Sequence, residues 1–141
     1  MTNNAEQIES AVTARLVPMD DRLKALPRHF ARLMGHVETM VYAYLDELAQ
    51  DYKGAYWEFF DLSNGGFYMA PRGEGELRLV VAGNYFEGSM SKDAAGIVAC
   101  LFAYGYLANS TGSEAMTDHY HALREYALDH PEAGQILAAI D

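Results

Sequence analysis

Histidine side chains are the first candidates for chemistry in this 141-residue chain, which contains five of them. His119 and His121 are two residues apart, so on a helix their side chains point about 200° apart and cannot share a metal ion. His121 and Glu125 are four residues apart and could both face one ion. Two ligands do not make a metal site, and the sequence shows no third. We therefore predict neither a metal nor a cofactor.

The sequence contains no recognisable arrangement for nucleophilic catalysis. Cys100 lies within an apolar stretch, where burial raises the pKa of a thiol and leaves it inert. Ser63 is not part of a Gly-x-Ser-x-Gly elbow. We predict a protein that is not an enzyme and has no catalytic residues. The alternative is an enzyme of unknown chemistry that uses His29, His119 or His121, which metal analysis and a His-to-Ala scan would reveal.

Carboxylates form a possible row on the last long helix, which we expect over residues 113–130. At 100° per residue, four acids fall within about 60° of one another, and they are Glu114, Asp118, Glu125 and Asp129. Apolar residues occupy the opposite side. The row could imitate the phosphates of DNA loosely, because its spacing is wider than that of a duplex. The alternative is an ordinary solvated stripe of an amphipathic helix.

Short apolar segments and turn residues predict the elements that would position these side chains. Asn64-Gly65-Gly66 is a strong hairpin signal between aromatic strands, because Asn and Gly tolerate positive φ. Ser91 is a good N-cap for an uncharged helix that must be buried on most sides. We expect strands at 12–17, 56–62, 67–70 and 77–81, an extended segment at 83–90, and helices at 20–26, from 34 to about 48, 94–108, 113–130 and 132–140.

These elements predict an α+β fold. The last three strands would form a small antiparallel three-stranded meander, because their connections are short, and four or five helices would pack with it. We expect Tyr85 and Phe86 to point inward, and the helix at 20–26 to end before Pro27. Alternate strand residues face opposite sides, so Tyr56, Phe60 and Tyr68 form either an exposed aromatic patch or a face covered by helices.

Length and composition set the wider limits. The chain is predicted to be one domain over residues 1–141, with a flexible segment at 1–10. Ten Lys and Arg residues against twenty acids give a net charge of −10, which argues against strong nucleic-acid binding. Residues 1–37 carry five bases and four acids, so the acidic excess lies beyond them. We expect a cytoplasmic protein, because the sequence shows no signal peptide and its apolar run is too short for a bilayer.

One long motif resembles a known family. Residues 57–71 read Trp-Glu-Phe-Phe-Asp-Leu-Ser-Asn-Gly-Gly-Phe-Tyr-Met-Ala-Pro, and this run resembles the signature of the ArdB/KlcA antirestriction family. Three further stretches are similar to the same family, at 27–30, 42–56 and 83–97. The resemblance extends from about Leu16 to the last long helix.

The resemblance implies a small α+β protein carried by plasmids, phages or genomic islands. Such proteins relieve type I restriction of unmodified incoming DNA by inhibiting the restriction endonuclease. It implies no catalytic residues. The expected partner is a type I restriction–modification enzyme or an associated host factor. The alternatives are an acidic DNA mimic that occupies the DNA-binding channel of the enzyme, and a nonspecific acidic binder of basic proteins.

A net charge of −10 is modest for a duplex mimic, so the residues favour protein–protein interaction. The candidate contact surface is the hairpin with its flanking residues, namely Tyr56, Asn64, Gly65, Gly66, Tyr68 and Arg72. The alternative is a purely structural role for the hairpin motif. On the contact hypothesis, we expect replacement of Asn64 and Tyr68 by Ala to abolish activity and leave the thermal midpoint nearly unchanged.

Overall fold

The computed structural model describes residues 11–141, so the expected flexibility of residues 1–10 lies outside the described part. The chain forms two small antiparallel sheets and a group of helices, which confirms the α+β prediction. The strands are β1 (Ala14–Leu16), β2 (Trp57–Leu62), β3 (Phe67–Pro71), β4 (Glu76–Val81) and β5 (Phe86–Ser91). The helices are α2 (Arg22–Phe30), α3 (Met34–Leu48), α4 (Lys92–Thr111), α5 (Glu114–Leu128) and α6 (Ala133–Ile140), with short 3-10 turns at Met19–Asp21, Ala31–Leu33 and Ala82–Asn84.

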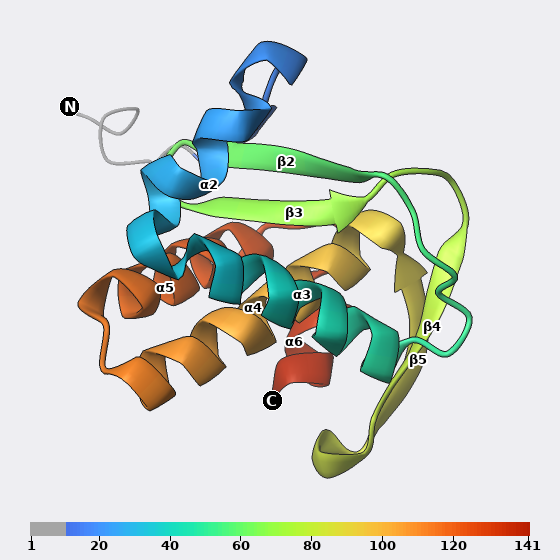
Figure 1. Cartoon of the computed structure of the whole chain (residues 1–141). Coiled ribbons are helices and arrows are strands. Elements are labelled where there is room, and N and C mark those ends of the chain that lie inside the picture. The colour runs from blue at the N-terminus through green and yellow to red at the C-terminus, as the bar shows by residue number, and fades with distance from the viewer. Residues whose placement is uncertain (1–10) are drawn as a thin grey trace, which may run out of the picture.

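The larger sheet lies on one side of the helices and has the order β1-β2-β3 (Figure 1). In its hairpin Phe60 pairs with Tyr68 and Phe59 with Met69. The predicted edge strand at 12–17 is present as β1 and pairs with β2. The smaller sheet, β4 with β5, lies at the other end of the molecule beside α6.

The expected meander is therefore wrong in its third strand, because β4 does not pair with β3. The far edge of β3 is already covered by α4, whose Tyr104 hydroxyl donates to the carbonyl oxygen of Phe67 at 2.6 Å. The thiol of Cys100 lies 3.5 Å from the carbonyl oxygen of Met69 on the same strand. Side chains of α4 thus occupy this edge of β3, and the third strand of the sheet is β1, which pairs with β2.

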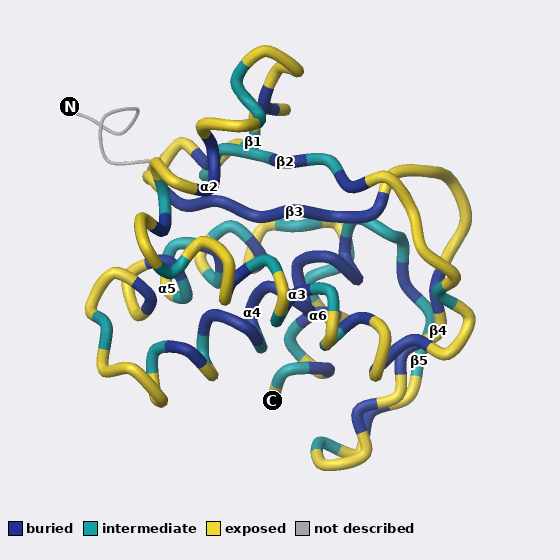
Figure 2. Tube along the Cα trace, viewed as in Figure 1, coloured by how far each residue is buried: buried dark blue, intermediate teal, exposed yellow. Residues whose placement is uncertain are grey.

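Helix α4 lies at the centre of the helical group and contacts α3, α5, α6 and β3 (Figure 2). It is the one helix of residues 11–141 that is long and apolar enough to cross a membrane by length and composition. The sequence expectation of a shorter apolar run was wrong, because the helix continues to Thr111 before Gly112 ends it with φ +71°. Since 61% of this apolar stretch is buried inside the protein, α4 is a core helix.

Two local expectations differ from the structure. Helix α2 does not end before Pro27 but includes it and runs to Phe30. Proline removes the donor for the Leu23 carbonyl, and Leu23 is almost fully exposed, so water can replace that donor. Tyr85 does not point inward: it is 98% exposed and has φ +53° in the turn before β5, whereas Phe86 is buried. Ser91 caps α4 as predicted, accepting from the backbone N–H of Ala94 at 3.1 Å.

Candidate functional site

The predicted contact residues at the hairpin turn are seated against α5. The side-chain amide of Asn64 donates to the carbonyl oxygen of Ala122 at 2.9 Å and to Glu125 Oε1 at 2.8 Å. Gly65 has φ +90°, which favours glycine. At Gly66 a Cβ atom would lie 2.9 Å from Ala122 Cβ. The Asn-Gly-Gly motif therefore has a docking role within the fold, although Asn64 and Gly65 remain exposed.

Tyr56 and Arg72 lie at the opposite end of the hairpin. Strands of this length separate the two ends by about 17–20 Å, so these residues and the turn do not form one compact site. The backbone N–H of Arg72 donates to the carbonyl oxygen of Tyr56 at 2.7 Å. The Arg72 guanidinium lies 5.8 Å from the Tyr56 ring centroid, and its Nε is 3.7 Å from Glu58.

Tyr68 is a core residue and not a surface residue. Its side chain is 1% exposed and stacks between Phe60, at 4.7 Å, and Tyr126 of α5, at 5.6 Å. Its hydroxyl donates to Asp93 Oδ1 at 2.7 Å. Burial, with the nearby Asp93 carboxylate, raises the pKa of Tyr68 far above its usual range. Helix α5 thus covers this part of the aromatic face, and replacing Tyr68 by Ala would destabilise the core by about 3–5 kcal/mol rather than leave the thermal midpoint unchanged.

The Asp93 carboxylate joins the start of α4 to the start of α6. His130 Nε2 lies 2.9 Å from Asp93 Oδ2, and His130 Nδ1 accepts from the backbone N–H of Glu132 at 2.9 Å. Because Nδ1 accepts, Nε2 carries the proton and donates to Asp93. Glu132 in turn accepts from the backbone N–H of Ser91 at 2.8 Å. Every polar group of this network is used to hold elements together.

A second network centres on Asp61 of β2. This carboxylate accepts from Arg28 at 3.0 and 3.2 Å and from Arg15 at 3.4 Å, and His29 Nε2 lies 2.7 Å from it. His119 Nε2 lies 3.1 Å from the carbonyl oxygen of His29, while its Nδ1 is buried and has no hydrogen-bond partner among residues 11–141. Burial, with the neighbouring His29, lowers the pKa of His119. The network fixes α2 against the sheet and α5.

The remaining candidates for chemistry do not converge. His119 is buried and His121 is exposed, as their spacing on a helix predicts. Burial raises the pKa of the Cys100 thiol to about 12, as its apolar segment predicts. Within residues 11–141, no group of three or more His, Cys, Asp or Glu side chains is close enough to hold a metal ion.

The four acids of the predicted row are all exposed: Glu114, Asp118 and Glu125 lie on α5, and Asp129 follows its last residue. The buried residues of the same helix include Met116, Leu123 and Ala127, so the amphipathic prediction is confirmed. Glu125 is not a free carboxylate, because it accepts the hydrogen bond from Asn64.

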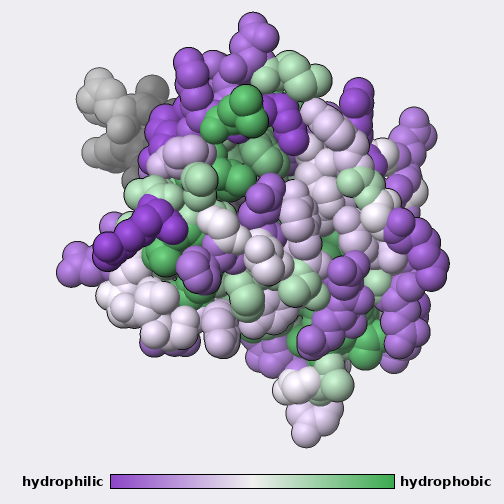
Figure 3. Space-filling view, viewed as in Figure 1, coloured by the Kyte–Doolittle hydropathy of each residue, from purple (hydrophilic) through white to green (hydrophobic). Residues whose placement is uncertain are grey.

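Sequence reasoning missed an exposed apolar and basic region around α2. Four large apolar residues are exposed there, namely Met19, Leu23, Met34 and Tyr56. In Figure 3 hydrophobic surface lies near α2 and is bordered by hydrophilic side chains. Of these four residues only Tyr56 is among the predicted contact residues, and the base-rich composition of residues 1–37 was the other sequence signal.

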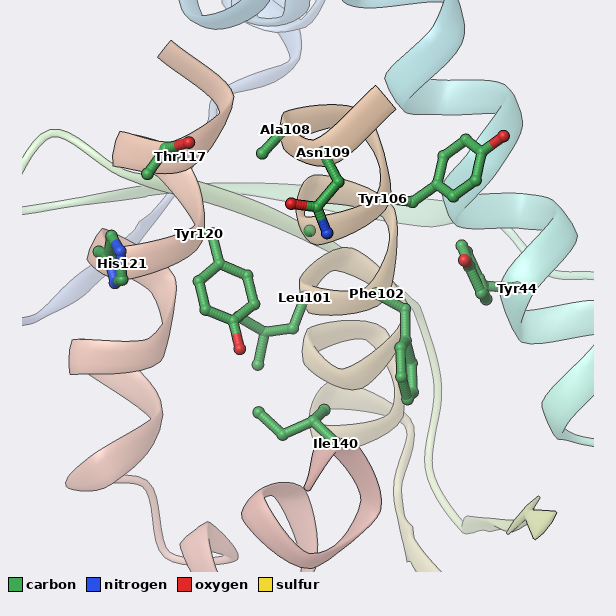
Figure 4. A pocket seen from close by; sticks show the side chains of 11 residues that line it. Tyr44, Leu101, Phe102, Tyr106, Ala108, Asn109, Thr117, Tyr120, His121 and Ile140 are labelled. Atoms are coloured by element: carbon green, nitrogen blue, oxygen red, sulfur yellow. The ribbon is translucent and has the colours of Figure 1, made fainter. Parts of the chain in front are cut away.

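A separate hollow of about 480 Å³ crosses the outer face of α4 between α3 and α5. Figure 4 shows Tyr44 and Tyr106 on one side of α4, with Tyr120 and His121 on the other. Tyr44 and Phe102 stack at 5.5 Å. Aromatic, aliphatic and polar side chains line this hollow together, and none of the predicted contact residues is among them.

Comparison with known proteins identifies the family. Residues 50–141 match the model of the family described as "Antirestriction protein". An antirestriction protein KlcA of Escherichia coli is 49% identical over 94% of this chain and 97% of the relative. A second KlcA from the same species is 44% identical over 96% of this chain and 97% of the relative. A putative antirestriction protein YubI of Escherichia coli K12 is 34% identical over 86% of this chain and 90% of the relative.

A solved structure agrees over its whole length. It superposes with a TM-score of 0.88 and 48% identity, covering 100% of both chains. That structure is described as showing, for the KlcA and ArdB proteins, a novel fold and antirestriction activity against Type I DNA restriction systems in vivo but not in vitro. The family prediction is confirmed, and the chain belongs to the antirestriction protein family.

Proposed function

We propose that this protein relieves type I restriction of unmodified incoming DNA in the cell, by binding a restriction complex or an associated host factor and without catalysing a reaction. The observation that carries the proposal is the full-length likeness to a structure described with this activity in vivo. That structure is also described as inactive in vitro, which favours a mechanism that needs a further cellular component.

The side chains of the fold support a binding role. Asp61 and Asp93 are the carboxylates best placed to orient a histidine, and both are engaged in networks that join elements. The Cys100 thiol is buried in the core. A protein that acts through its surface is consistent with this use of its polar groups.

The charge distribution favours protein–protein contact over DNA mimicry. The chain carries ten Lys and Arg residues among its twenty acids, whereas a mimic must present a dense and continuous array of negative charge. The acidic row of α5 has four members, and one of them is bound to Asn64.

The test is the plating efficiency of unmodified phage on a type I restricting host, with and without expression of the protein. We expect expression to raise plating on the restricting host and to leave it unchanged on an isogenic host without restriction. Methylation of cognate sites is measured in the same cells. Raised plating with methylation intact supports selective relief of cleavage. Raised plating with methylation lost indicates occupation of the shared DNA-binding channel, and unchanged plating contradicts the proposal.

A further inference from the structure

The apolar and basic side chains that reach the surface around α2 define what we call the α2 face: Met19, Arg22, Leu23, Lys24, Arg32, Met34 and Tyr56. The Tyr56 hydroxyl lies 3.7 Å from the Met19 sulfur, so these two side chains are adjacent. Leu23 and Met34 line one hollow of about 320 Å³. Leu23 is 92% exposed, although its neighbours on the helix, Ala25 and Leu26, are buried.

The hollow has a firm floor. Phe59 of β2 and Leu26 of α2 lie at its base, and both are buried. The Arg22 guanidinium lies 4.1 Å from the Phe59 ring centroid and 4.8 Å from that of Tyr56, so this guanidinium is held over two aromatic rings. A second hollow shares Met34 with the first and continues past Arg32 along α3. The two hollows form a groove that lies alongside the exposed apolar side chains.

The bases of the α2 face are available to a partner. Arg22, Lys24 and Arg32 take part in no ion pair among residues 11–141. Glu38, the acid that lines the groove, is engaged by the Tyr42 hydroxyl at 3.1 Å. Residues 14–39 carry five bases and three acids in a chain whose net charge is −10. Arg15 and Arg28 among these bases pair with Asp61, and even so this segment is less acidic than the remainder of the chain.

Resting on the proposed function, we propose that the α2 face is the docking surface for an acidic protein segment that places an apolar side chain in the groove. Arg, Tyr and Met are enriched at the centres of protein interfaces, and a desolvated apolar contact beside complementary charges is the common form of an interaction hot spot. The phosphates of a nucleic acid would contact the basic side chains of the α2 face. They would not contact Met19, Leu23 and Met34 favourably, because apolar side chains donate no hydrogen bond to a phosphate.

Matched substitutions test the surface in the phage-plating assay. We expect Leu23→Asp to lower the relief of restriction at least tenfold, because it places a charge in the contact. The matched control is Leu128→Asp at an exposed leucine of α5, which should retain relief. Both residues are exposed, so the thermal midpoint of each variant should stay within about 2 °C of the parent's. Equal relief by folded Leu23→Asp and the parent would overturn the proposal.

Charge reversal on the α2 face tests the sign of the partner's charge. We expect Lys24→Glu to lower relief several-fold and Lys24→Arg to retain it. Lys92→Glu, at the start of α4, changes the net charge by the same amount outside the α2 face and should retain relief. If Lys24→Glu and Lys92→Glu behave alike, the α2 face does not select an acidic partner.

Cross-linking in the cell identifies the occupant independently of activity. A photoreactive benzoylphenylalanine at position 23 is expected to yield an adduct with a segment rich in Asp and Glu, whereas the same probe at position 128 is not. An adduct with DNA, with a second copy of this chain, or with a basic segment would overturn the proposal, as would the absence of any adduct. If the parent protein fails to relieve restriction, the proposed function fails, and cross-linking still decides the surface.

Discussion

At the residue scale, two glycines of α4 differ in how closely the neighbouring atoms approach them. A Cβ atom at Gly96 would lie 2.5 Å from both Cα and Cβ of Ala70 and 2.6 Å from the Met69 carbonyl oxygen, so the helix and strand could not keep their separation. At Gly105 the nearest atoms are those of the Tyr120 ring at 3.7 Å, an ordinary contact. Only the first glycine is required by packing.

We therefore expect Gly96→Ala to lower the free energy of unfolding by about 2 kcal/mol or more, because the obstructing atoms are backbone atoms and a Cβ atom, which cannot move away without shifting the strand. Gly105→Ala is the matched control and should raise it by about 0.5–1 kcal/mol, since alanine is the better helix former. Urea unfolding followed by circular dichroism measures both. A destabilisation of similar size at the two positions would contradict this assignment.

The buried His119 predicts a dependence of stability on pH. Its pKa is lowered in the folded protein, mainly by burial, and protonation would place a second N–H at Nδ1, for which the described part of the chain provides no acceptor. The unfolded chain then binds the proton first, below its ordinary pKa of 6.5. Stability rises with pH where the unfolded state binds more protons, so this contribution is lost as the pH falls below about 6.5.

We expect the free energy of unfolding of the parent to fall more steeply between pH 7.5 and 5 than that of His119→Gln, by up to about 1.4 kcal/mol per pH unit. Glutamine keeps a donor for the His29 carbonyl oxygen but does not titrate. Parallel pH profiles of the two proteins would show that His119 does not contribute.

At the scale of elements, side chains of α4 cover the edge of β3 that does not pair with β2. The Tyr104 hydroxyl donates to the carbonyl oxygen of Phe67, and both residues are fully buried. We expect Tyr104→Phe to lower the free energy of unfolding by about 1–3 kcal/mol, because it leaves a buried acceptor without a partner. Tyr106→Phe, at an exposed tyrosine of the same helix, should change it by less than about 0.5 kcal/mol. Denaturant unfolding of the two variants checks this contrast.

The same edge explains what sequence reasoning could and could not predict. Periodicity, turn residues and caps correctly predicted α3, the β2–β3 hairpin, α4 and α5, because these signals are local. The partner of β4 could not be predicted locally. It depends on whether another element covers β3, and the Tyr104 and Cys100 contacts that cover it join residues more than thirty positions apart.

The candidate site was predictable only in part for a similar reason. Alternation placed Tyr68 and Phe60 on one face of the sheet, and the structure agrees, but it could not show that Tyr126 of α5 covers Tyr68. The Asn-Gly-Gly motif was correctly predicted as a turn, whereas its docking on Ala122 depends on tertiary structure. The exposure of Leu23 also depends on tertiary structure, because Ala25 and Leu26 of the same helix are buried.

At the scale of the whole molecule, charge is divided between two regions. The α2 face carries bases that are free of ion pairs within residues 11–141, while the exposed side of α5 carries the acidic row. Such an arrangement can orient the protein toward a partner before contact, since fields from clustered charges act over about a Debye length of 8–10 Å. None of the four acids of the row belongs to the α2 face.

This division predicts that the acidic row is dispensable. We expect a variant with all four acids neutralised to keep its relief of restriction within about twofold of the parent's, measured by phage plating: Glu114→Gln, Asp118→Asn, Glu125→Gln and Asp129→Asn. Gln at position 125 still offers an oxygen to Asn64, so the hairpin contact survives. A control neutralises four other exposed acids, namely Asp46, Glu47, Glu74 and Glu76, and changes net charge equally.

Loss of relief in the α5 variant alone would favour DNA mimicry, because a mimic acts through a specific array of charge. Loss in both variants would instead show dependence on overall charge, as for a nonspecific binder of basic proteins, whose complexes dissociate in moderate salt. Retained relief in both leaves the two charged surfaces with different roles: the acidic row serves solubility, and the α2 face supplies the specific contact.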